Sequence, residues 1–236
     1  MTWVAGADGC RGGWIVVLLN RRKGRPPAWQ VRLCPTFEEV LILSPRPSVI
    51  AVDMPIGLSD RPEPGGRRCD REARRLLGPR ASSIFSPPSR SLLFATSYAQ
   101  VRWKGLSVQA FGILPKIREV DRLMTPSLQR LVYESHPELA FAALAGRPLR
   151  FNKKTPQGRR ERLHVLALAQ GKLFHGIGGI ARQELSRFPR TQVMPDDLLD
   201  ATVLTLTALR IANGTATRVP ADPPLDRKGL RQEIWY

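Results

Sequence analysis

Short apolar runs, separated by turns of glycine, proline and polar residues, dominate the first quarter of the chain and predict a β-sheet. Residues 3–7 and 14–19 are two such runs, and the glycine-rich link at 9–13 between them is typical of a hairpin. Residues 28–34 alternate between apolar and polar positions, which predicts a third strand. Residues 49–52 are continuously apolar and rich in β-branched side chains, and this pattern predicts a strand buried on both faces.

Polar signals at the ends of periodic segments predict helices between and after these strands. Thr36, with Glu39 three residues later, has the spacing of a capping box, so we expect a short helix through Leu43 and the order β-β-β-α-β for the first quarter. Residues 130–134 predict a further strand. Five further segments have helical signals, and these are residues 67–77, 109–122, 138–145, 161–173 and 195–211. The helix at 109–122 is expected to have a break at Pro115.

The lengths of these segments bound the architecture. We expect an α/β fold with a mixed sheet and the order β-β-β-α-β-α-β-α, as a single domain over residues 1–219 with a helical insertion at about 61–125. Residues 220–236 are expected to form a polar tail without clear structure. No apolar run approaches the roughly 18 residues of a membrane span. The run at 14–19 follows no basic segment that would make it a signal peptide, so a cytoplasmic protein is expected.

Carboxylates follow three of the predicted strands. Asp8 comes after the first strand, Asp53 after the fourth, and Glu134 ends the strand at 130–134. Ligands of open α/β sheets bind outside the carboxyl ends of the strands, so these side chains are candidates for one common site. For Asp53 taken alone, capping of the turn that follows it is an equally ordinary role.

A further group of acids begins the last predicted helix. Residues three or four apart lie on one face of a helix, so Asp197 and Asp200 can point the same way. Asp196 and Asp197 have the alternative role of complementing the helix dipole. Asp200 is more informative, because it lies among apolar residues, where a buried carboxylate is costly unless a cation or another partner meets it.

Such a cluster of acids would have a specific chemistry. Several carboxylates pressed together repel one another unless cations neutralise them, and Mg²⁺ and Mn²⁺ prefer carboxylate oxygens and water. Two such ions about 4 Å apart activate a water and stabilise the leaving oxygen of a phosphodiester. We therefore expect Asp8, Asp53, Glu134 and Asp200 to be metal ligands, with Asp197 as a further catalytic residue. The sequence contains neither a Cys/His metal motif nor a Gly-x-x-x-x-Gly-Lys-Ser/Thr phosphate loop.

The charge balance favours a polyanionic partner. The chain carries 37 lysines and arginines against 20 aspartates and glutamates, which gives a net charge of +17. Nucleic acid is the first candidate for that partner, with genomic base bias as the alternative explanation of an arginine-rich composition. The residues expected to bind phosphate, for which a solvated surface or a turn is the alternative role, are Lys116, Lys153, Lys154, Arg159, Arg160, Ser82 and Ser83.

Histidine and tryptophan give weaker signals. His136, two residues after Glu134, could transfer a proton or orient an acid, but a structural role is the commoner one. The five tryptophans are scattered along the sequence, so we expect no stacking platform of the kind found in proteins that bind single strands.

The predicted order of elements, with acids after the first and fourth strands, resembles the ribonuclease H-like fold, a superfamily of metal-dependent nucleases, resolvases and transposases with some phosphotransferases. Five segments are similar to the DUF429 family, whose members are predicted to be ribonuclease H-like nucleases, and these are residues 8–14, 53–58, 69–74, 134–138 and 196–201. The resemblance implies a ribonuclease H-like mixed sheet with a metal-binding acidic centre. The last helix also resembles the resolvase branch, whose Asp-x-x-Asp-Ala pattern falls on Asp197 and Asp200.

Three functions follow as hypotheses. The first is a nuclease that hydrolyses phosphodiester bonds of nucleic acid with two Mg²⁺ or Mn²⁺ ions. The second is a nucleic-acid-binding module on the same fold without catalysis, and the third is an actin-like phosphotransferase relative that uses ATP. The sequence leaves open the choice between DNA and RNA, the choice between endonuclease and exonuclease, and the oligomeric state, for which a homodimer is one alternative.

Overall fold

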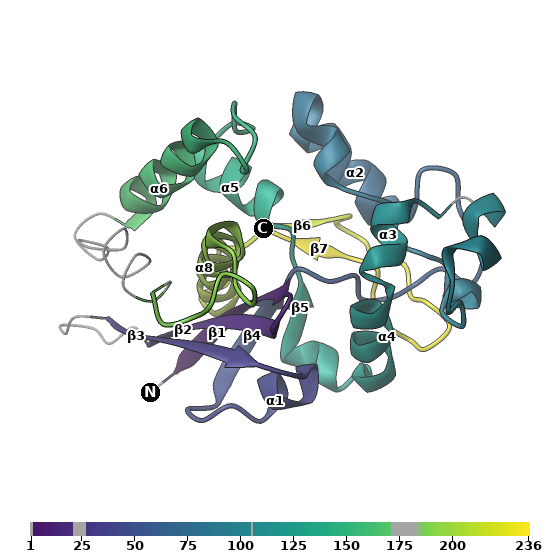
Figure 1. Cartoon of the computed structure of the whole chain (residues 1–236), viewed down its shortest axis with the longest axis horizontal. Helices are drawn as coiled ribbons and strands as arrows, with labels where there is room; N and C mark the ends of the chain where they lie inside the picture. Colours follow the sequence, from purple (N-terminus) through teal and green to yellow (C-terminus); the bar gives the residue numbers. More distant parts are fainter. Residues whose placement is uncertain (1, 21–26, 105, 171–183, 185) are drawn as a thin grey trace.

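The computed structural model describes residues 2–20, 27–104, 106–170, 184 and 186–236. Its centre is a five-stranded mixed sheet in the order β3-β2-β1-β4-β5 (Figure 1). β2 is antiparallel to both β1 and β3, whereas β4 is parallel to both β1 and β5. The bounds of these strands are Trp3–Cys10 for β1, Gly13–Asn20 for β2, Ala28–Cys34 for β3, Pro47–Val52 for β4 and Val132–Glu134 for β5.

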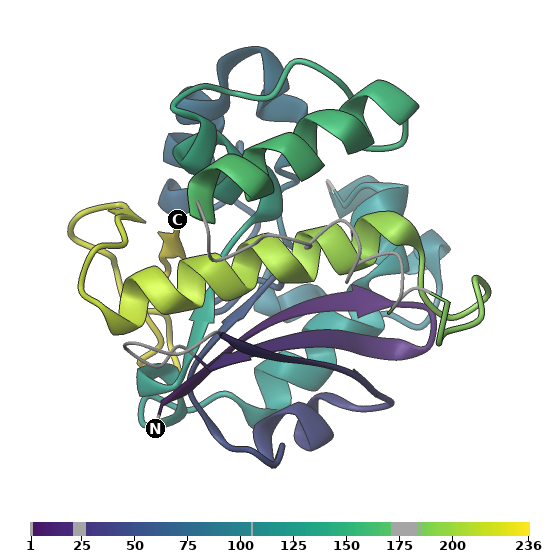
Figure 2. The same ribbon diagram turned by 90° about the vertical axis from the view of Figure 1, so that its left-hand side faces the viewer.

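Helices cover both faces of this sheet. The apolar side chains of one face pack with those of α1 (Phe37–Leu41) and α4 (Leu114–Leu123). Those of the other face pack with α5 (Pro137–Ala145), α6 (Pro156–Gln170) and α8 (Pro195–Ala212). Figure 2 shows α8 lying across this second face. The chain is thus a three-layer α/β fold, and among the described residues no helix is both long enough and apolar enough to cross a membrane.

Gly6 allows α8 to approach the sheet closely. A Cβ atom at Gly6 would lie 2.2 Å from both the Ala201 carbonyl oxygen and the Thr205 backbone nitrogen. The Thr205 hydroxyl donates to the Val17 carbonyl oxygen of β2 at 2.9 Å, which ties the helix to the strand beside it. The first turns of α8, where Asp200 lies, are therefore held directly against β1.

Most elements formed by local patterns lie where the sequence predicts them. Thr36 caps α1 by accepting a hydrogen bond from the Glu39 backbone N–H at 3.4 Å. The expected helix at 109–122 is divided into α3 (Val108–Gly112) and α4, and the break falls at Ile113, because Pro115 occupies the first turn of the second helix. α2 spans Arg68–Leu77. α6 begins earlier than expected, and the predicted end at residue 173 falls outside the described residues.

The segment at 220–236 differs from the expected tail, because it folds back on the domain. β7 (Ile234–Trp235) pairs with β6 (Arg218–Val219), and Trp235 forms a bridge to Ser135 beyond the end of β5. Leu230 and Ile234 are buried. Two apolar residues four positions apart are too few to establish a period in this polar sequence, so the order of the segment depends on contacts with distant residues.

Candidate functional site

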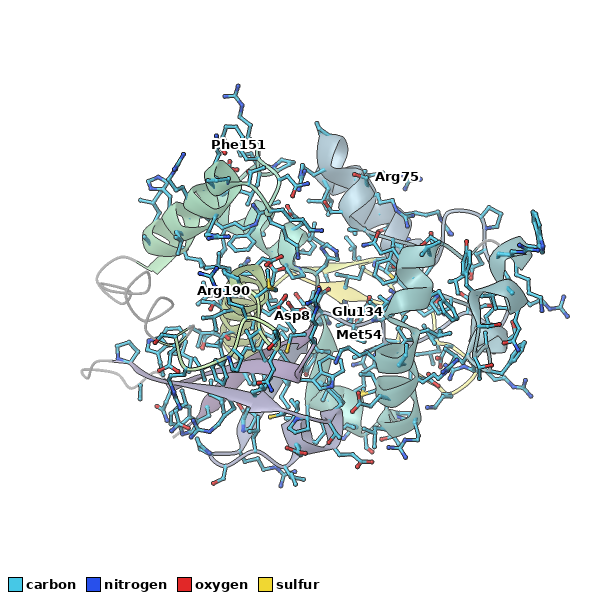
Figure 3. All side chains as sticks on the ribbon, in the orientation of Figure 1. Asp8, Met54, Arg75, Glu134, Phe151 and Arg190 are labelled. Atoms are coloured by element: carbon cyan, nitrogen blue, oxygen red, sulfur yellow. The ribbon has the colours of Figure 1, made fainter. Side chains whose placement is uncertain are left out.

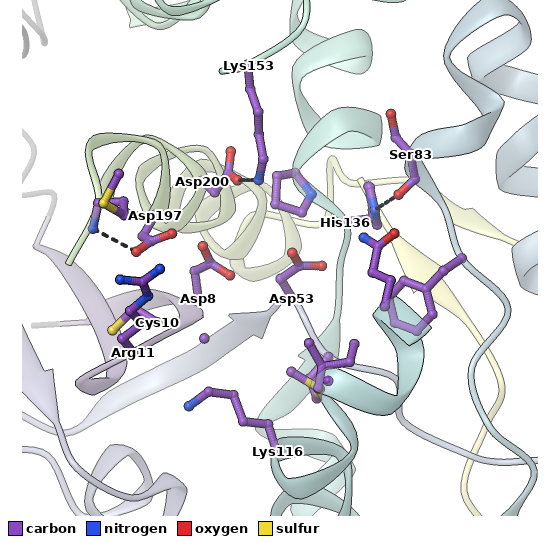
Figure 4. Close-up of a pocket in the computed structure, with 18 of the residues that line it drawn as sticks. Asp8, Cys10, Arg11, Asp53, Ser83, Lys116, His136, Lys153, Asp197 and Asp200 are labelled. Carbon is purple, nitrogen blue, oxygen red and sulfur yellow. Dashed lines mark hydrogen bonds and ion pairs between the residues drawn. The ribbon is translucent and has the colours of Figure 1, made fainter. Parts of the chain in front are cut away.

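Three aspartates from three different elements line one cavity of about 980 Å³. Asp8 lies in β1 shortly before its end, Asp53 directly follows β4, and Asp200 lies in α8. Figure 4 shows the carboxyl groups of these residues facing a common space, with Asp197 beside Asp8. Figure 3 shows Asp8 and Glu134 in the interior of the molecule, whereas Arg75 and Phe151 lie at its periphery.

The strand pairing explains why the aspartates meet. β1 and β4 are parallel with Ala7 opposite Val52, and the Asp53 backbone N–H donates to the Ala7 carbonyl oxygen at 3.1 Å. Asp8 and Asp53 each follow one member of this pair, so both side chains project from the face that α8 covers. Asp200 precedes Ala201, whose carbonyl lies against Gly6. The parallel pairing of β1 and β4 therefore brings together Asp8 and Asp53, two of the acids that the sequence suggests for one common site.

Burial makes these carboxyl groups hard to ionise. Only 7% of Asp8 and 1% of Asp200 is exposed. Burial, followed by the nearby charges of Asp53 and Asp200, raises the pKa of Asp8 well above its ordinary value. Burial likewise raises the pKa of Asp53, and it raises that of Asp200 to about 7 although Lys153 opposes the shift. The three groups form an electrostatically strained cluster that a positive charge would relieve.

Lys153 supplies one such charge. Its Nζ lies 2.5 Å from Asp200 Oδ2, and its side chain is 35% exposed. Burial lowers the pKa of Lys153, but the charges of Asp200, Asp8 and Asp53 outweigh that effect and raise it overall. Lys153 was expected to bind phosphate, whereas the structure places its ammonium among the aspartates (Figure 4).

Asp197 has two roles in the geometry. Its Oδ2 accepts a hydrogen bond from the Met194 backbone N–H at 2.8 Å, which caps the start of α8. It also lines the cavity, and burial raises its pKa. Asp196 is absent from the described lining of the cavity. Capping and a place at the site are therefore combined in Asp197 rather than being alternatives.

Glu134, expected as a metal ligand, lies apart from this cavity. Its two carboxylate oxygens accept hydrogen bonds from Arg67 Nη1 at 2.8 Å and Arg67 Nη2 at 2.5 Å, and Oε2 also accepts one from the Ile56 backbone N–H at 2.6 Å. The cause is the alternation of side chains between the two faces of the sheet. Glu134 pairs in register with Val52, so it points to the sheet face opposite that of Asp8 and Asp53. The parallel register of a three-residue strand cannot be read from the sequence.

Glu138 takes the place beside the cavity that we had expected for Glu134. It lies in the first turn of α5, is 6% exposed, and lines the cavity. Its Oε1 accepts hydrogen bonds from buried Arg162 and, at 3.3 Å, from Arg80, while Oε2 has no partner among the described residues. The available sequence signal was the one used for Asp200, a carboxylate that lies among apolar residues of a helix.

His136 also faces the site with a free ring nitrogen. Its Nε2 lies 3.1 Å from the Ser83 carbonyl oxygen. Because a carbonyl oxygen only accepts hydrogen bonds, Nε2 must carry the hydrogen. The other ring nitrogen, Nδ1, is buried and has no partner within the described structure. His136 is thus held in a fixed orientation next to Asp53 (Figure 4).

The expected phosphate-binding residues fall into two groups. Ser82, Ser83, Lys116 and Lys154 line the cavity together with Lys153. Arg159 and Arg160 are exposed on α6 and are not part of the described lining. Sequence reasoning missed two further cavity cations, Arg11 and Arg80.

Lys116 is anchored at the rim by the first hairpin. Its Nζ donates to the Gly13 carbonyl oxygen at 2.6 Å and lies 4.6 Å from the centre of the Trp14 ring. Burial lowers its pKa. These contacts hold a positive charge near Asp8 without an ion pair to it in the described structure, so the ammonium is positioned to meet an anion that enters the cavity.

The donor set suits a hard divalent cation, although the side chains are not arranged around one. Asp200 Oδ1 and Glu138 Oε2 are buried oxygens that lack a partner in the described part of the chain, and carboxylates are the ligands that Mg²⁺ and Mn²⁺ prefer. As they stand, no three described Asp, Glu, His or Cys side chains are close enough together to hold one ion. Lys153 already occupies Asp200 Oδ2, so its ammonium would compete with a cation for this carboxylate.

Comparison with known proteins gave one match. The sequence profile described as "Protein of unknown function (DUF429)" matches residues 6–225, which includes every residue of the cavity named above. Searches of curated proteins and of solved structures returned no match. Since the match covers nearly the whole chain, the protein belongs to the DUF429 family.

Proposed function

We propose that the protein is a nuclease of the ribonuclease H-like type, which hydrolyses phosphodiester bonds of nucleic acid with the help of Mg²⁺ or Mn²⁺. The observation that carries this proposal is the convergence of buried Asp8, partly buried Asp53 and buried Asp200 on one open cavity. Holding three carboxyl groups close together at an opening in the surface is unfavourable. A cation bound among them would offset this cost.

The topology supports the fold part of the proposal. The order β-β-β-α-β along the chain, on which the resemblance to ribonuclease H-like proteins rests, is the order of β1 to β4 with α1 between β3 and β4. Asp8 lies near the end of β1 and Asp53 follows β4, its parallel neighbour, and a third acid comes from the helix that covers these strands. Ligand sites of open sheets lie at such strand ends.

The chain's own residues would divide the work as follows. Asp8, Asp53 and Asp200 would hold the divalent cation, with Glu138 and Asp197 at the edge of the same cavity. The bound cation would activate water and stabilise the leaving oxygen. Residues of the rim would bind the phosphates of the substrate, and these are Lys116, Lys154, Arg11, Ser82 and Ser83.

The test is hydrolysis by purified protein of a panel of single-stranded, double-stranded and branched DNA and RNA, with Mg²⁺, with Mn²⁺ and with EDTA. We expect cleavage that requires the metal and is lost in Asp53→Asn. The matched control is Glu134→Gln, which changes a buried carboxylate outside the cavity. No cleavage of any substrate would refute the catalytic proposal, and cleavage that persists in Asp53→Asn would assign it to another site or a contaminant.

A second function, nucleic-acid binding without catalysis, is favoured by one observation. The Lys153 ammonium already neutralises part of the aspartate cluster, so the folded cavity does not depend on a metal. In this case DNA or RNA would bind in EDTA as tightly as in Mg²⁺, and the protein would not be stabilised against heat by Mg²⁺ or Mn²⁺. Metal-dependent stabilisation that is lost in Asp53→Asn would favour the nuclease.

A further inference from the structure

The segment between α2 and the end of α4 combines positive charge with exposed aromatic rings. Residues 73–118 contain eight lysines and arginines and no aspartate or glutamate. Within this segment Trp103 is 84% exposed and Phe94 is 61% exposed. An exposed tryptophan leaves a large apolar surface in water, so the two rings require an explanation.

Packing of the segment does not supply that explanation. Its apolar residues form a small core of their own, and Phe94 and Trp103 are outside it. The buried members of this core are Leu92, Ala95, Val101, Leu106, Ala110 and Leu114. The local fold is therefore closed without the two rings, which makes them available to a partner.

A cationic side chain lies against each ring, and the two cations flank Trp103 in the sequence. The Arg102 guanidinium is 4.8 Å from the centre of the Trp103 ring, and Lys104 Nζ is 5.6 Å from the centre of the Phe94 ring. Since Arg102, Trp103 and Lys104 are consecutive, Phe94 lies beside this turn, and the four residues form one surface patch, which we call the aromatic patch. In this patch flat apolar rings alternate with positive charges, and these charges form no ion pair with any described acidic side chain.

The aromatic patch is connected to the cavity through the chain. Gln109, Gly112 and Ile113, from α3 and the residue after it, line the cavity, and α3 packs into the same small core as the patch segment. The segment that carries Trp103 is thus joined to the lining of the cavity by α3.

We propose that the aromatic patch binds unpaired nucleotides of a nucleic acid strand, with bases stacked on Trp103 and Phe94 and phosphates on Arg102 and Lys104. Stacking on aromatic rings is available to bases of a single strand, whereas the bases of a duplex are stacked on each other. This inference rests on the proposed function for the class of partner and adds a preference for single strands. It also replaces the expectation from sequence that the tryptophans form no stacking surface.

The test is binding of a fluorescein-labelled oligothymidylate of about 20 nucleotides, measured by anisotropy in EDTA so that no hydrolysis occurs. Loss of one stacked base weakens binding by about 5- to 150-fold, so this is the change in Kd expected for Trp103→Ala. Trp103→Phe keeps a flat ring and should retain most of the affinity. Ile42→Ala, at a residue that is 79% exposed after α1, is the matched control and should leave Kd unchanged.

Two further measurements separate the possible outcomes. Binding of a blunt duplex of the same length should change less than about twofold in Trp103→Ala, since stacked pairs do not use the ring. Quenching of tryptophan fluorescence by the oligothymidylate should disappear in Trp103→Ala. Unchanged single-strand affinity in that variant, an equal loss for the duplex, or no binding of either nucleic acid would overturn the proposal.

The outcome is independent of the catalytic proposal. If the wild type hydrolyses nothing but Trp103→Ala loses single-strand binding, the aromatic patch is supported and the nuclease proposal fails. If the wild type hydrolyses nucleic acid and Trp103→Ala binds single strands normally, the nuclease proposal stands and the patch proposal fails.

Discussion

Lys153 offers the sharpest test of the site, because its ammonium lies where a metal ion would reduce the charge of the aspartate cluster. We predict that Lys153→Met destabilises the protein in EDTA and strengthens the binding of Mn²⁺. Methionine has a similar length and no charge, so the variant removes the ion pair to Asp200 while keeping most of the packing of the side chain. A cation would then no longer compete with the lysine for Asp200.

The magnitude follows from the burial of the two partners. Breaking a buried ion pair by removing one partner costs about 3–5 kcal/mol. Lys153 is 35% exposed and Asp200 has a pKa of about 7, so solvent screening and protonation of Asp200 reduce the loss. We expect about 1–2 kcal/mol, which lowers Tm by about 2–8 °C for a chain of this length. The same 1–2 kcal/mol no longer opposes the cation, and this corresponds to a Kd for Mn²⁺ about 5- to 30-fold lower than in the wild type.

The assays are thermal unfolding in EDTA and calorimetric titration with Mn²⁺. Lys154→Met is the matched control, since Lys154 also lines the cavity but its side chain forms no ion pair among the described residues. We expect this control to change neither Tm in EDTA nor the Kd for Mn²⁺ by more than a small amount. Equal Mn²⁺ affinity in Lys153→Met and the wild type would refute the reasoning, because the lysine would then not occupy the position of a cation.

Other perturbations test the electrostatics, the packing and the assignment of acids. Burial raises the pKa of Asp8, so the folded state keeps a proton that the unfolded chain has released. The contribution of Asp8 to stability is therefore fully present below about pH 4 and is lost as the pH rises through its folded-state pKa. In EDTA, urea unfolding at pH 5 and pH 8 should differ less in Asp8→Asn than in the wild type. Gly6→Ala should lower the free energy of unfolding by about 3 kcal/mol or abolish folding, because its Cβ would lie 2.2 Å from backbone atoms of α8. A denaturant titration measures this change. A fully stable Gly6→Ala would mean that α8 does not pack against β1 as described. Glu134→Gln should cost about 2–3 kcal/mol of stability, because it weakens the hydrogen bonds to Arg67, and should leave the Kd for Mn²⁺ unchanged. Glu138→Gln should weaken Mn²⁺ binding. The opposite pattern in calorimetry would mean that Glu134, and not Glu138, belongs to the metal site.

The elements that the sequence predicts well are those specified by neighbouring residues. The alternation at 28–34 gives β3, and the pairing of Thr36 with Glu39 gives the start of α1, because each depends only on positions within the element itself. The order of residues 220–236 could not be predicted in this way. Its buried Leu230 and Ile234 are stabilised by contacts with segments far away in the chain.

The candidate site shows the same division between local and distant information. Asp8 and Asp53 could be predicted as neighbours because two strands that each end near a carboxylate needed only to pair in parallel. The contact of Lys153 with Asp200 could not, since it joins a loop to a helix with no pattern that relates them.

Glu134 and Glu138 show which part of the reasoning transfers and which part does not. A carboxylate at the end of a strand points to one of two faces of the sheet, and the face depends on the register of the strand. The pairing of Glu134 with Val52 places Glu134 on the face away from the cavity. A carboxylate within an otherwise apolar helix carries a stronger signal, because its burial requires a partner wherever the helix packs. That criterion selected Asp200 correctly as a buried residue, and applied to Pro137–Ala145 it selects Glu138, which lines the same cavity. For this fold the two criteria are complementary: position near a strand end selects Asp8 and Asp53, and the cost of burying a charge selects Asp200 and Glu138.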